Sequence, residues 1–273
     1  FLDIIGGQAE PGPPAPQRAA LRFVRTLSRR RGRGAWRFLS PEPVVHEIDT
    51  AHEEWIAQAE RLIYVETQYF RNRRMARRLA KVARDRPDLK MILILPAAPD
   101  DVAFEGATGL DARLGEYLQA KCLRILRRGF GRRLFVGGAA QPRRTRARGR
   151  AQLRGAPLVY IHAKVSIFDD QAAIVSSANL NGRSLRWDTE AGIVMTDPDS
   201  VSGLRQRLMA HWLPDGAGAD FFDPERAVQA WWGLAARNAK LPPEKRRGFL
   251  LPYNLRLAET FGRAFPLVPE EMV

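Results

Sequence analysis

The residues best suited to chemistry lie in the short segment His162-Ala-Lys164. In an extended strand, side chains two positions apart project from the same face, so His162 and Lys164 can point into one cavity while Ile161 and Val165 point into the core. An ammonium neutralises the non-bridging oxygens of a phosphodiester, and an imidazole attacks phosphorus or protonates a leaving oxygen. The pair therefore predicts phosphodiester chemistry.

Polar residues further along the chain extend this set. Ser177 and Asn179, again two positions apart, offer a hydroxyl and an amide N–H to the same phosphate, and Glu190 follows as a carboxylate that could orient the imidazole. A lone His-x-Lys pair is common by chance, and a buried histidine is more often a satisfied core residue. The whole set is much more specific than the pair.

The elements that must position these residues alternate between strand and helix, which predicts an α/β fold. Periodicity predicts strands at 21–27, 62–65, 90–95, 132–136, 158–161, 165–168, 172–176 and 193–196. It predicts helices at 43–61, 72–86, 111–128 and 198–212. Residues 169–171 should form a hairpin turn. The arginine-rich segment 141–154 is expected to be too self-repulsive to pack, and therefore to be a mobile loop beside the site.

Domain organisation follows from proline content and hydrophobic periodicity. Residues 1–20 include a proline-rich stretch and are expected to be a linker or the remnant of an upstream half. Residues 21–273 should form one domain, in which the proline-rich C-terminal segment wraps the sheet.

Composition excludes disordered and fibrous proteins. The chain has 273 residues, of which 45% are hydrophobic, and 44 Lys and Arg against 30 Asp and Glu give a formal net charge of +14. Such a charge favours an anionic partner without choosing between membrane, nucleic acid and phosphorylated substrate. The single cysteine, Cys122, is expected to be a core thiol. No apolar run approaches the ~18 to 20 residues of a spanning helix, which favours a cytoplasmic or peripheral membrane protein, export not being excluded.

The spacing of the polar set resembles the HKD signature of the phospholipase D superfamily. Its elements are His162-x-Lys164-x4-Asp169, Ser176-Ser-Ala-Asn179, Leu180-Asn-Gly-Arg-Ser184 and Asp188-Thr-Glu190. A second stretch, Ile63-Tyr-Val-Glu-Thr-Gln-Tyr-Phe70, is similar to the motif that opens the second half of two-HKD phospholipases D. The chain thus resembles the C-terminal, second-HKD half of a bacterial enzyme of this kind. The resemblance implies a phospholipase D/nuclease-like α/β/α sandwich with a mixed central β-sheet.

The resemblance also implies a role for each matching residue. His162 would be one of two catalytic histidines, acting as general acid toward the alcohol leaving group and then as base for water. Lys164 and Asn179 would bind phosphate, Glu190 would be the acidic partner of the histidine, and Asp169 would be structural. Substrate-binding roles fall to Ser177, Gln68 and Tyr69. Ser176 stands where the family commonly has glycine, and its side chain requires a little more space near the phosphate.

The family mechanism needs a second histidine that this chain does not supply in a second HKD motif. His46, His52 and His211 have no His-x-Lys context and are expected to be surface or helix residues. The second HKD half would come from an upstream half of the same protein, from another chain, or from a second copy in a homodimer. The second-half motif and the start at Phe1 favour the first of these.

The function expected from the resemblance is that of a phospholipase D or phosphatidyltransferase. It would act on a zwitterionic or anionic phospholipid surface and form phosphatidic acid through a phosphohistidine. A nuclease is the alternative, motivated by the net charge and by segment 141–154, although that segment lacks aromatic residues for base stacking. A non-catalytic half that only binds is a third possibility. Neither a metal nor a cofactor is expected, since the sequence has no clustered His, Cys and carboxylate ligands.

Overall fold

One nine-stranded mixed β-sheet organises the chain in the computed structural model, which describes residues 20–29 and 41–264. The linker or remnant predicted for residues 1–20 lies outside this part, apart from residue 20. The strand order is β11-β5-β4-β3-β8-β9-β10-β1-β2, in which β3–β4 and β4–β5 are parallel and the other pairs antiparallel. The strands are β1 (Leu21–Arg29), β2 (Glu42–His46), β3 (Leu62–Thr67), β4 (Lys90–Ile94), β5 (Leu134–Ala139), β8 (Lys164–Phe168), β9 (Ala172–Ser176), β10 (Glu190–Met195) and β11 (Leu250–Pro252).

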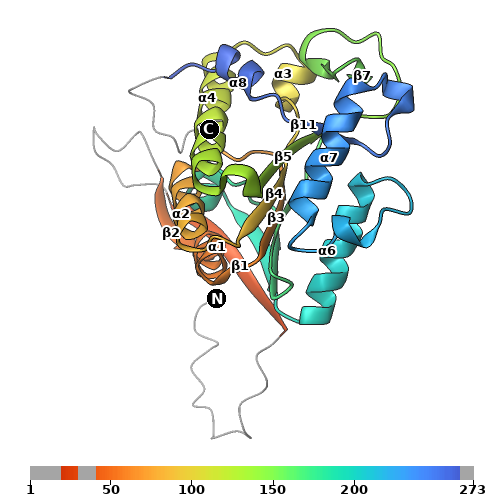
Figure 1. Ribbon diagram of the computed structural model, residues 1–273. Helices are drawn as coiled ribbons and strands as arrows, with labels where there is room; N and C mark the ends of the chain where they lie inside the picture. The colour runs from red at the N-terminus through yellow and green to blue at the C-terminus, as the bar shows by residue number, and fades with distance from the viewer. Residues whose placement is uncertain (1–19, 30–40, 265–273) are drawn as a thin grey trace, which may run out of the picture.

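Helices cover both faces of this sheet (Figure 1). One face carries α1 (Glu47–Gln58), α2 (Arg73–Asp85), α4 (Leu110–Phe130), α5 (Gly182–Arg186) and α8 (Leu255–Phe261). The other carries α6 (Pro198–Trp212) and α7 (Ala227–Lys240). The short α3 (Asp100–Phe104) follows β4 at the end of the sheet where the parallel strands finish. The predicted α/β/α sandwich with a mixed central sheet is confirmed.

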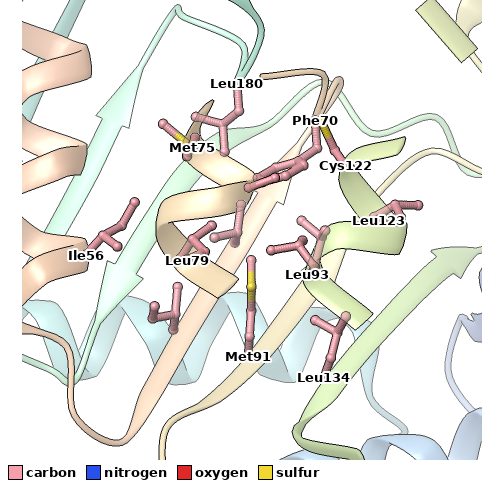
Figure 2. Packing of buried hydrophobic residues seen from close by; sticks show 14 of the residues in the cluster. Ile56, Phe70, Met75, Leu79, Met91, Leu93, Cys122, Leu123, Leu134 and Leu180 are labelled. Atoms are coloured by element: carbon pink, nitrogen blue, oxygen red, sulfur yellow. The ribbon is translucent and has the colours of Figure 1, made fainter. Parts of the chain in front are cut away.

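Alternation along the central strands divides the core between the two faces. Ile63 and Val65 of β3 pack on the α2–α4 side, whereas Leu62 and Tyr64 pack on the α6–α7 side. Figure 2 shows the first cluster, where side chains of α2 and α4 meet those of β4. Cys122 lies in this cluster, where burial raises the pKa of its thiol, so the expected core thiol is confirmed.

The helix predicted from residue 43 is wrong at its beginning. Residues 42–46 form the edge strand β2, which pairs with β1, and α1 begins only at Glu47. The consecutive β-branched residues Val44 and Val45 favour an extended backbone once β1 offers an edge to pair with. The spacing of apolar residues in the sequence carries no information about this pairing with β1.

The strand predicted at 158–161 is also wrong. Leu158 makes a single bridge to Ala140, and the chain then continues without a strand until Lys164. Pairing between β3 and β8 starts at Thr67 and Lys164, so the residues before Lys164 lie beyond the end of the neighbouring strand. Leu158 and Ile161 are nevertheless buried.

Part of segment 141–154 packs, contrary to the expectation that it is too self-repulsive to do so, although Arg146 and Arg148 are exposed. It contains a 3-10 turn, Gly149–Ala151, and β6 (Gln152–Leu153), which pairs with β7 (Ala156–Pro157). Arg150 reaches the fully buried carboxylate of Glu116 in α4 at 2.7 Å. The carboxylates that neutralise arginines of this segment come from distant elements. A count of the arginines within the segment alone therefore overstates their mutual repulsion.

The C-terminal region takes part in the sheet as well as covering it. Helix α7 packs on the sheet, and β11 adds an antiparallel strand beside β5. The sequence predicted a wrapping segment of short helices and did not identify β11.

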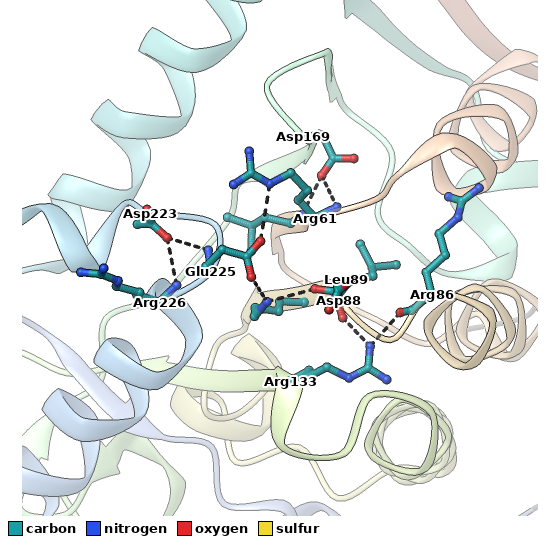
Figure 3. A network of polar contacts seen from close by, with 11 residues as sticks. Arg61, Arg86, Asp88, Leu89, Arg133, Asp169, Asp223, Glu225 and Arg226 are labelled. Atoms are coloured by element: carbon teal, nitrogen blue, oxygen red, sulfur yellow. Dashed lines mark hydrogen bonds and ion pairs between the residues drawn. The ribbon is translucent and has the colours of Figure 1, made fainter.

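The end of the sheet remote from the parallel strands' C-termini is closed by a dense polar network (Figure 3). Asp169, in the β8–β9 turn, accepts hydrogen bonds from the backbone amides of Glu60, Arg61 and Leu62. Arg133 donates to four backbone carbonyls, those of Ala83, Arg86, Leu89 and Gly129. This network ties the start of β3 to the β8–β9 turn. The antiparallel pairing of β8 with β9, with Phe168 opposite Ala172, confirms the predicted hairpin turn.

Candidate active site

Gln68 is the centre of the candidate site, directly after the last residue of β3. Its side-chain oxygen accepts hydrogen bonds from Lys164 Nζ at 3.3 Å and from Asn179 Nδ2 at 3.2 Å. These three residues come from the ends of three neighbouring strands, because β8 pairs with both β3 and β9. The structure therefore brings together the ammonium and the amide that the sequence predicted as phosphate ligands, on one acceptor oxygen.

Two tyrosines hold the other end of the Gln68 amide. Gln68 Nε2 donates to the hydroxyl of Tyr69 at 3.2 Å and to the hydroxyl of Tyr160. Both donors and both acceptor positions of the amide are thus occupied, which fixes its orientation. The ring of Tyr69 is in turn covered by the guanidinium of Arg71, 3.9 Å from the ring centroid.

Tyr160 is the site residue that sequence reasoning did not single out. Its ring stacks on the imidazole of His162, with centroids 6.3 Å apart and an interplanar angle of 25°. A signal was present, because Tyr160 precedes His162 by two positions and shares its face in extended backbone.

His162 is the exposed member of the site. Its backbone carbonyl accepts a hydrogen bond from Lys164 Nζ at 3.0 Å, so the ammonium group lies against the backbone of His162. Neither ring nitrogen forms a hydrogen bond within residues 20–29 and 41–264. Both nitrogens are therefore available to a substrate or to a partner residue.

The electrostatic environment of Lys164 has two opposing contributions. Partial burial of the side chain lowers its pKa, and the nearby carboxylate of Glu190 raises it by a smaller amount, so the pKa lies below the ordinary lysine value. Burial thus weakens the hydration of a cation, which increases what that cation gains from binding an anion.

Glu190, the first residue of β10, contacts Ser177 in this structure. Its carboxylate accepts the hydroxyl hydrogen of Ser177, and Ser177 Oγ accepts the backbone amide of Ala191 at 3.1 Å. No hydrogen bond between Glu190 and His162 occurs in the described ranges. The orienting role of Glu190 therefore stays a prediction, as does the substrate-binding role of Ser177.

The extra volume of Ser176 is accommodated by the opposite strand. Ser176 pairs with Gly192 of β10, and a Cβ atom at position 192 would lie 2.5 Å from that of Ser176. Since real Cβ atoms do not approach so closely, the serine is tolerated because its neighbour is glycine.

The motif around Gln68 is joined to the HKD segment by the backbone. The carbonyl of Leu180 accepts the amides of Arg71 and Asn72, and the amide of Leu180 donates to the carbonyl of Tyr69. Asn72 also caps α2 by accepting the amide of Met75 at 2.9 Å. The segment therefore enters α2 in a fixed position next to Asn179.

A buried histidine lies beneath the site. His52 of α1 has its Nδ1 2.8 Å from the carbonyl of Ile48 and its Nε2 3.1 Å from Ser166 Oγ in β8. A carbonyl only accepts, so Nδ1 carries the proton and Nε2 accepts from the serine hydroxyl. Burial lowers the pKa of this histidine. It is a helix residue, as expected, but not a surface one.

Asp169 does not join the site. It follows β8 at the end of that strand opposite to Lys164, in the polar network described above. In the described parts of the chain no group of three or more His, Cys, Asp or Glu is arranged to hold a metal ion. No helix in the same parts is long and apolar enough to cross a bilayer.

Lys164 and Asn179 thus converge on one acceptor oxygen beside the exposed residue His162, at one end of the sheet. The sequence profile of the family described as "Cardiolipin synthase, PLD-like domain" matches residues 53–212, more than half of the chain. The chain belongs to the phospholipase D-like family.

Similar curated proteins are considerably longer than this chain. Phospholipase D1 of Rattus norvegicus is 25% identical over 246 residues, which cover 71% of this chain and 22% of the relative. Phospholipase D1 of Schizosaccharomyces pombe is 28% identical over 226 residues, which cover 67% of this chain and 16% of the relative. The chain thus spans about a fifth of the length of these relatives.

Two solved structures are similar at a lower level. Phosphatidylserine synthase from Haemophilus influenzae has a TM-score of 0.43 and 19% identity, over 68% of this chain and 37% of that chain. Nuc from Salmonella typhimurium, a phospholipase D family member, has a TM-score of 0.42 and 11% identity, over 70% of this chain and 93% of that chain.

Proposed function

We propose that this chain supplies one half of a phospholipase D-type active site, which cleaves the head-group phosphodiester of glycerophospholipids to phosphatidic acid. The observation that carries the proposal is the convergence of Lys164 and Asn179 on Gln68 Oε1, beside an exposed His162. A phosphoryl oxygen is an acceptor like the amide oxygen, so a phosphodiester can take its place between the two donors.

The reaction would proceed in two displacements through a phosphohistidine. A nitrogen of the second catalytic histidine attacks phosphorus, the bond from phosphorus to the head-group oxygen breaks, and protonated His162 gives its proton to that oxygen. His162 then takes a proton from water, whose oxygen attacks phosphorus and breaks the P–N bond. A second alcohol in place of water gives transphosphatidylation.

The remaining residues would stabilise charge and position groups. Lys164 and Asn179 hold the non-bridging oxygens as negative charge develops on them. Glu190 would orient the imidazole once substrate or partner has ordered it, with Ser177 between them, while Gln68 and Tyr69 shape the phosphate pocket. Asp169 keeps the structural role argued from its three amide contacts.

The second histidine would come from a complementary HKD half. An upstream half of the same protein, another chain, or a second copy of this chain would each meet the requirement. The second-half motif and the fraction of its relatives that the chain covers favour the first source.

The test is the release of phosphatidic acid from phosphatidylcholine vesicles, measured by mass spectrometry with this chain alone and with a complementary half. Adding ethanol should divert product to phosphatidylethanol. His162→Asn should abolish both products, and Asn179→Asp is a second variant that keeps the size of the side chain. Absence of product when both histidines are present would refute the proposal.

A nuclease is the second candidate, because Arg146 and Arg148 are exposed and form no ion pair with residues 20–29 or 41–264. Cleavage of plasmid DNA by the same pair of halves, with no phosphatidic acid formed, would establish it in place of the lipid reaction. Salt-sensitive DNA binding without cleavage would indicate a half that only binds.

A further inference from the structure

Two large apolar side chains are exposed at the active-site end of the sheet. Helix α3 buries Val102 and Ala103 against the body of the protein, but the next residue, Phe104, is 54% exposed. Leu110, the first residue of α4, is 67% exposed. Phe104 belongs to the connection between β4 and α4, and Leu110 begins α4 where this connection ends. The connection lies at the end of the sheet where the candidate site lies.

This apolar surface is continuous with the candidate site. The ring edge of Phe104 meets Tyr160, with centroids 6.2 Å apart at 78°, and Tyr160 stacks on His162. The hydroxyl of the same tyrosine accepts the amide of Gln68. A molecule that covers Phe104 therefore lies one aromatic ring away from the reacting imidazole.

Unpaired cations lie at the same end. The 3-10 turn Gly149–Ala151 packs against α3, and Arg150 is fixed there by Glu116 and by the carbonyl of Ala97. The preceding Arg146 and Arg148 are exposed, and no described residue forms an ion pair with either. Exposed carboxylates also lie there, Glu105 beside Phe104 and Asp111 beside Leu110, and they oppose this charge.

We propose that Phe104, Leu110, Arg146 and Arg148 form an interfacial surface that docks on an anionic phospholipid bilayer. The inference rests on the proposed function, because a reaction on membrane lipids explains why a lipid-binding surface adjoins the site. Apolar side chains enter the boundary between head groups and acyl chains, while arginines bind lipid phosphates. Segment 141–154 has no aromatic side chain to stack on bases, so nucleic acid would use the arginines but leave Leu110 uncovered.

The experiment measures binding to sedimented vesicles of phosphatidylcholine alone or with about a third phosphatidylglycerol, since an anionic surface strengthens binding about five-fold per arginine. The double variants Arg146→Gln/Arg148→Gln and Phe104→Ser/Leu110→Ser should each bind the anionic vesicles about ten-fold more weakly or worse. Glu105→Gln should bind more tightly.

Matched controls lie away from the surface. Arg127→Gln/Arg128→Gln removes the same charge at the far end of α4, and Val44→Ser removes an apolar side chain that is 55% exposed on β2. Both controls should keep vesicle binding within about two-fold. Equal weakening by the control arginines would overturn the proposal in favour of diffuse attraction.

Failure of the docking surface and failure of the proposed function have different signatures. His162→Asn should bind vesicles normally but lose turnover, whereas the surface variants should lose turnover on vesicles and keep it on a monomeric short-chain phosphatidylcholine. Unchanged vesicle binding by both surface variants would overturn the proposal. If the surface variants instead lose binding to DNA or to the complementary half, that macromolecule is the partner, and the proposal is also overturned.

Discussion

The two ends of the central sheet satisfy their polar groups in opposite ways. At the remote end, Asp169 accepts from three backbone amides and Arg133 donates to four backbone carbonyls, so both groups are used within the fold (Figure 3). At the active-site end, Lys164 and Asn179 share one amide oxygen and the ring nitrogens of His162 bond to no described residue. The remote end thus uses its polar groups within the fold, whereas at the candidate-site end the ring nitrogens of His162 remain available to a ligand.

The strongest test of this contrast is His162→Asn in the assembled pair of halves. Loss of the acid and base should reduce the rate of phosphatidic acid release by about a thousand-fold, while the free energy of unfolding changes by less than about 0.5 kcal/mol. Assays of phosphatidic acid release stopped at fixed times measure the rate, and urea denaturation measures the free energy of unfolding. A large loss of stability would mean that the active-site end also holds the fold together.

The reverse outcome is expected for Arg133→Met at the remote end. Four carbonyls lose their donor, so unfolding should become easier by about 2–4 kcal/mol in urea, with turnover of the folded protein unchanged. Arg132→Met is the matched control, because the neighbouring Arg132 is exposed and bonds to no described residue. Equal effects of the two substitutions would contradict the contrast.

Asp169→Asn should have a smaller effect in the same direction. Asparagine tolerates the positive φ of 52° at this position and keeps one acceptor oxygen, but replaces charge-assisted hydrogen bonds with neutral ones and loses an acceptor. We expect a loss of about 1–2 kcal/mol in unfolding free energy. Retention of full stability would show that the charge of the motif aspartate is not used structurally.

The mildest test concerns His52, beneath the site. Burial lowers its pKa below that of the unfolded chain, near about 6.5, so the unfolded state binds the extra proton first as pH falls. Stability from this residue is therefore present above about pH 7 and is lost toward about pH 5. Urea denaturation of His52→Gln and of the unaltered chain at both pH values should show a smaller pH dependence in the variant.

The sequence predicted what depends on local pattern. Strand 172–176 and helix 198–212 form over the predicted residues, because a short run of β-favouring residues and an aspartate before Pro198 are both local signals. His162, Lys164 and Asn179 were identified from spacing, since residues two positions apart share a face. These positions needed no knowledge of the rest of the fold.

What depends on distant partners was missed. Within 141–154, Arg150 packs because Glu116 reaches it from α4, and Arg144 is paired with Glu244. Residues 42–46 are extended because β1 offers an edge. The sequence included Gln68 as a substrate ligand but could not place its amide between Lys164 and Asn179, which lie about a hundred residues later.

The pairing of β3 with β8 has a consequence for how the site is acquired during folding. The register joins Tyr64 to Ile167, so the two strands that carry Gln68 and Lys164 meet only after a loop of about a hundred residues has closed. Such non-local pairing is slow, while α2 and α4 can form from local contacts. During synthesis the chain should therefore hold a helical, partly parallel core before it holds any phosphate-binding site.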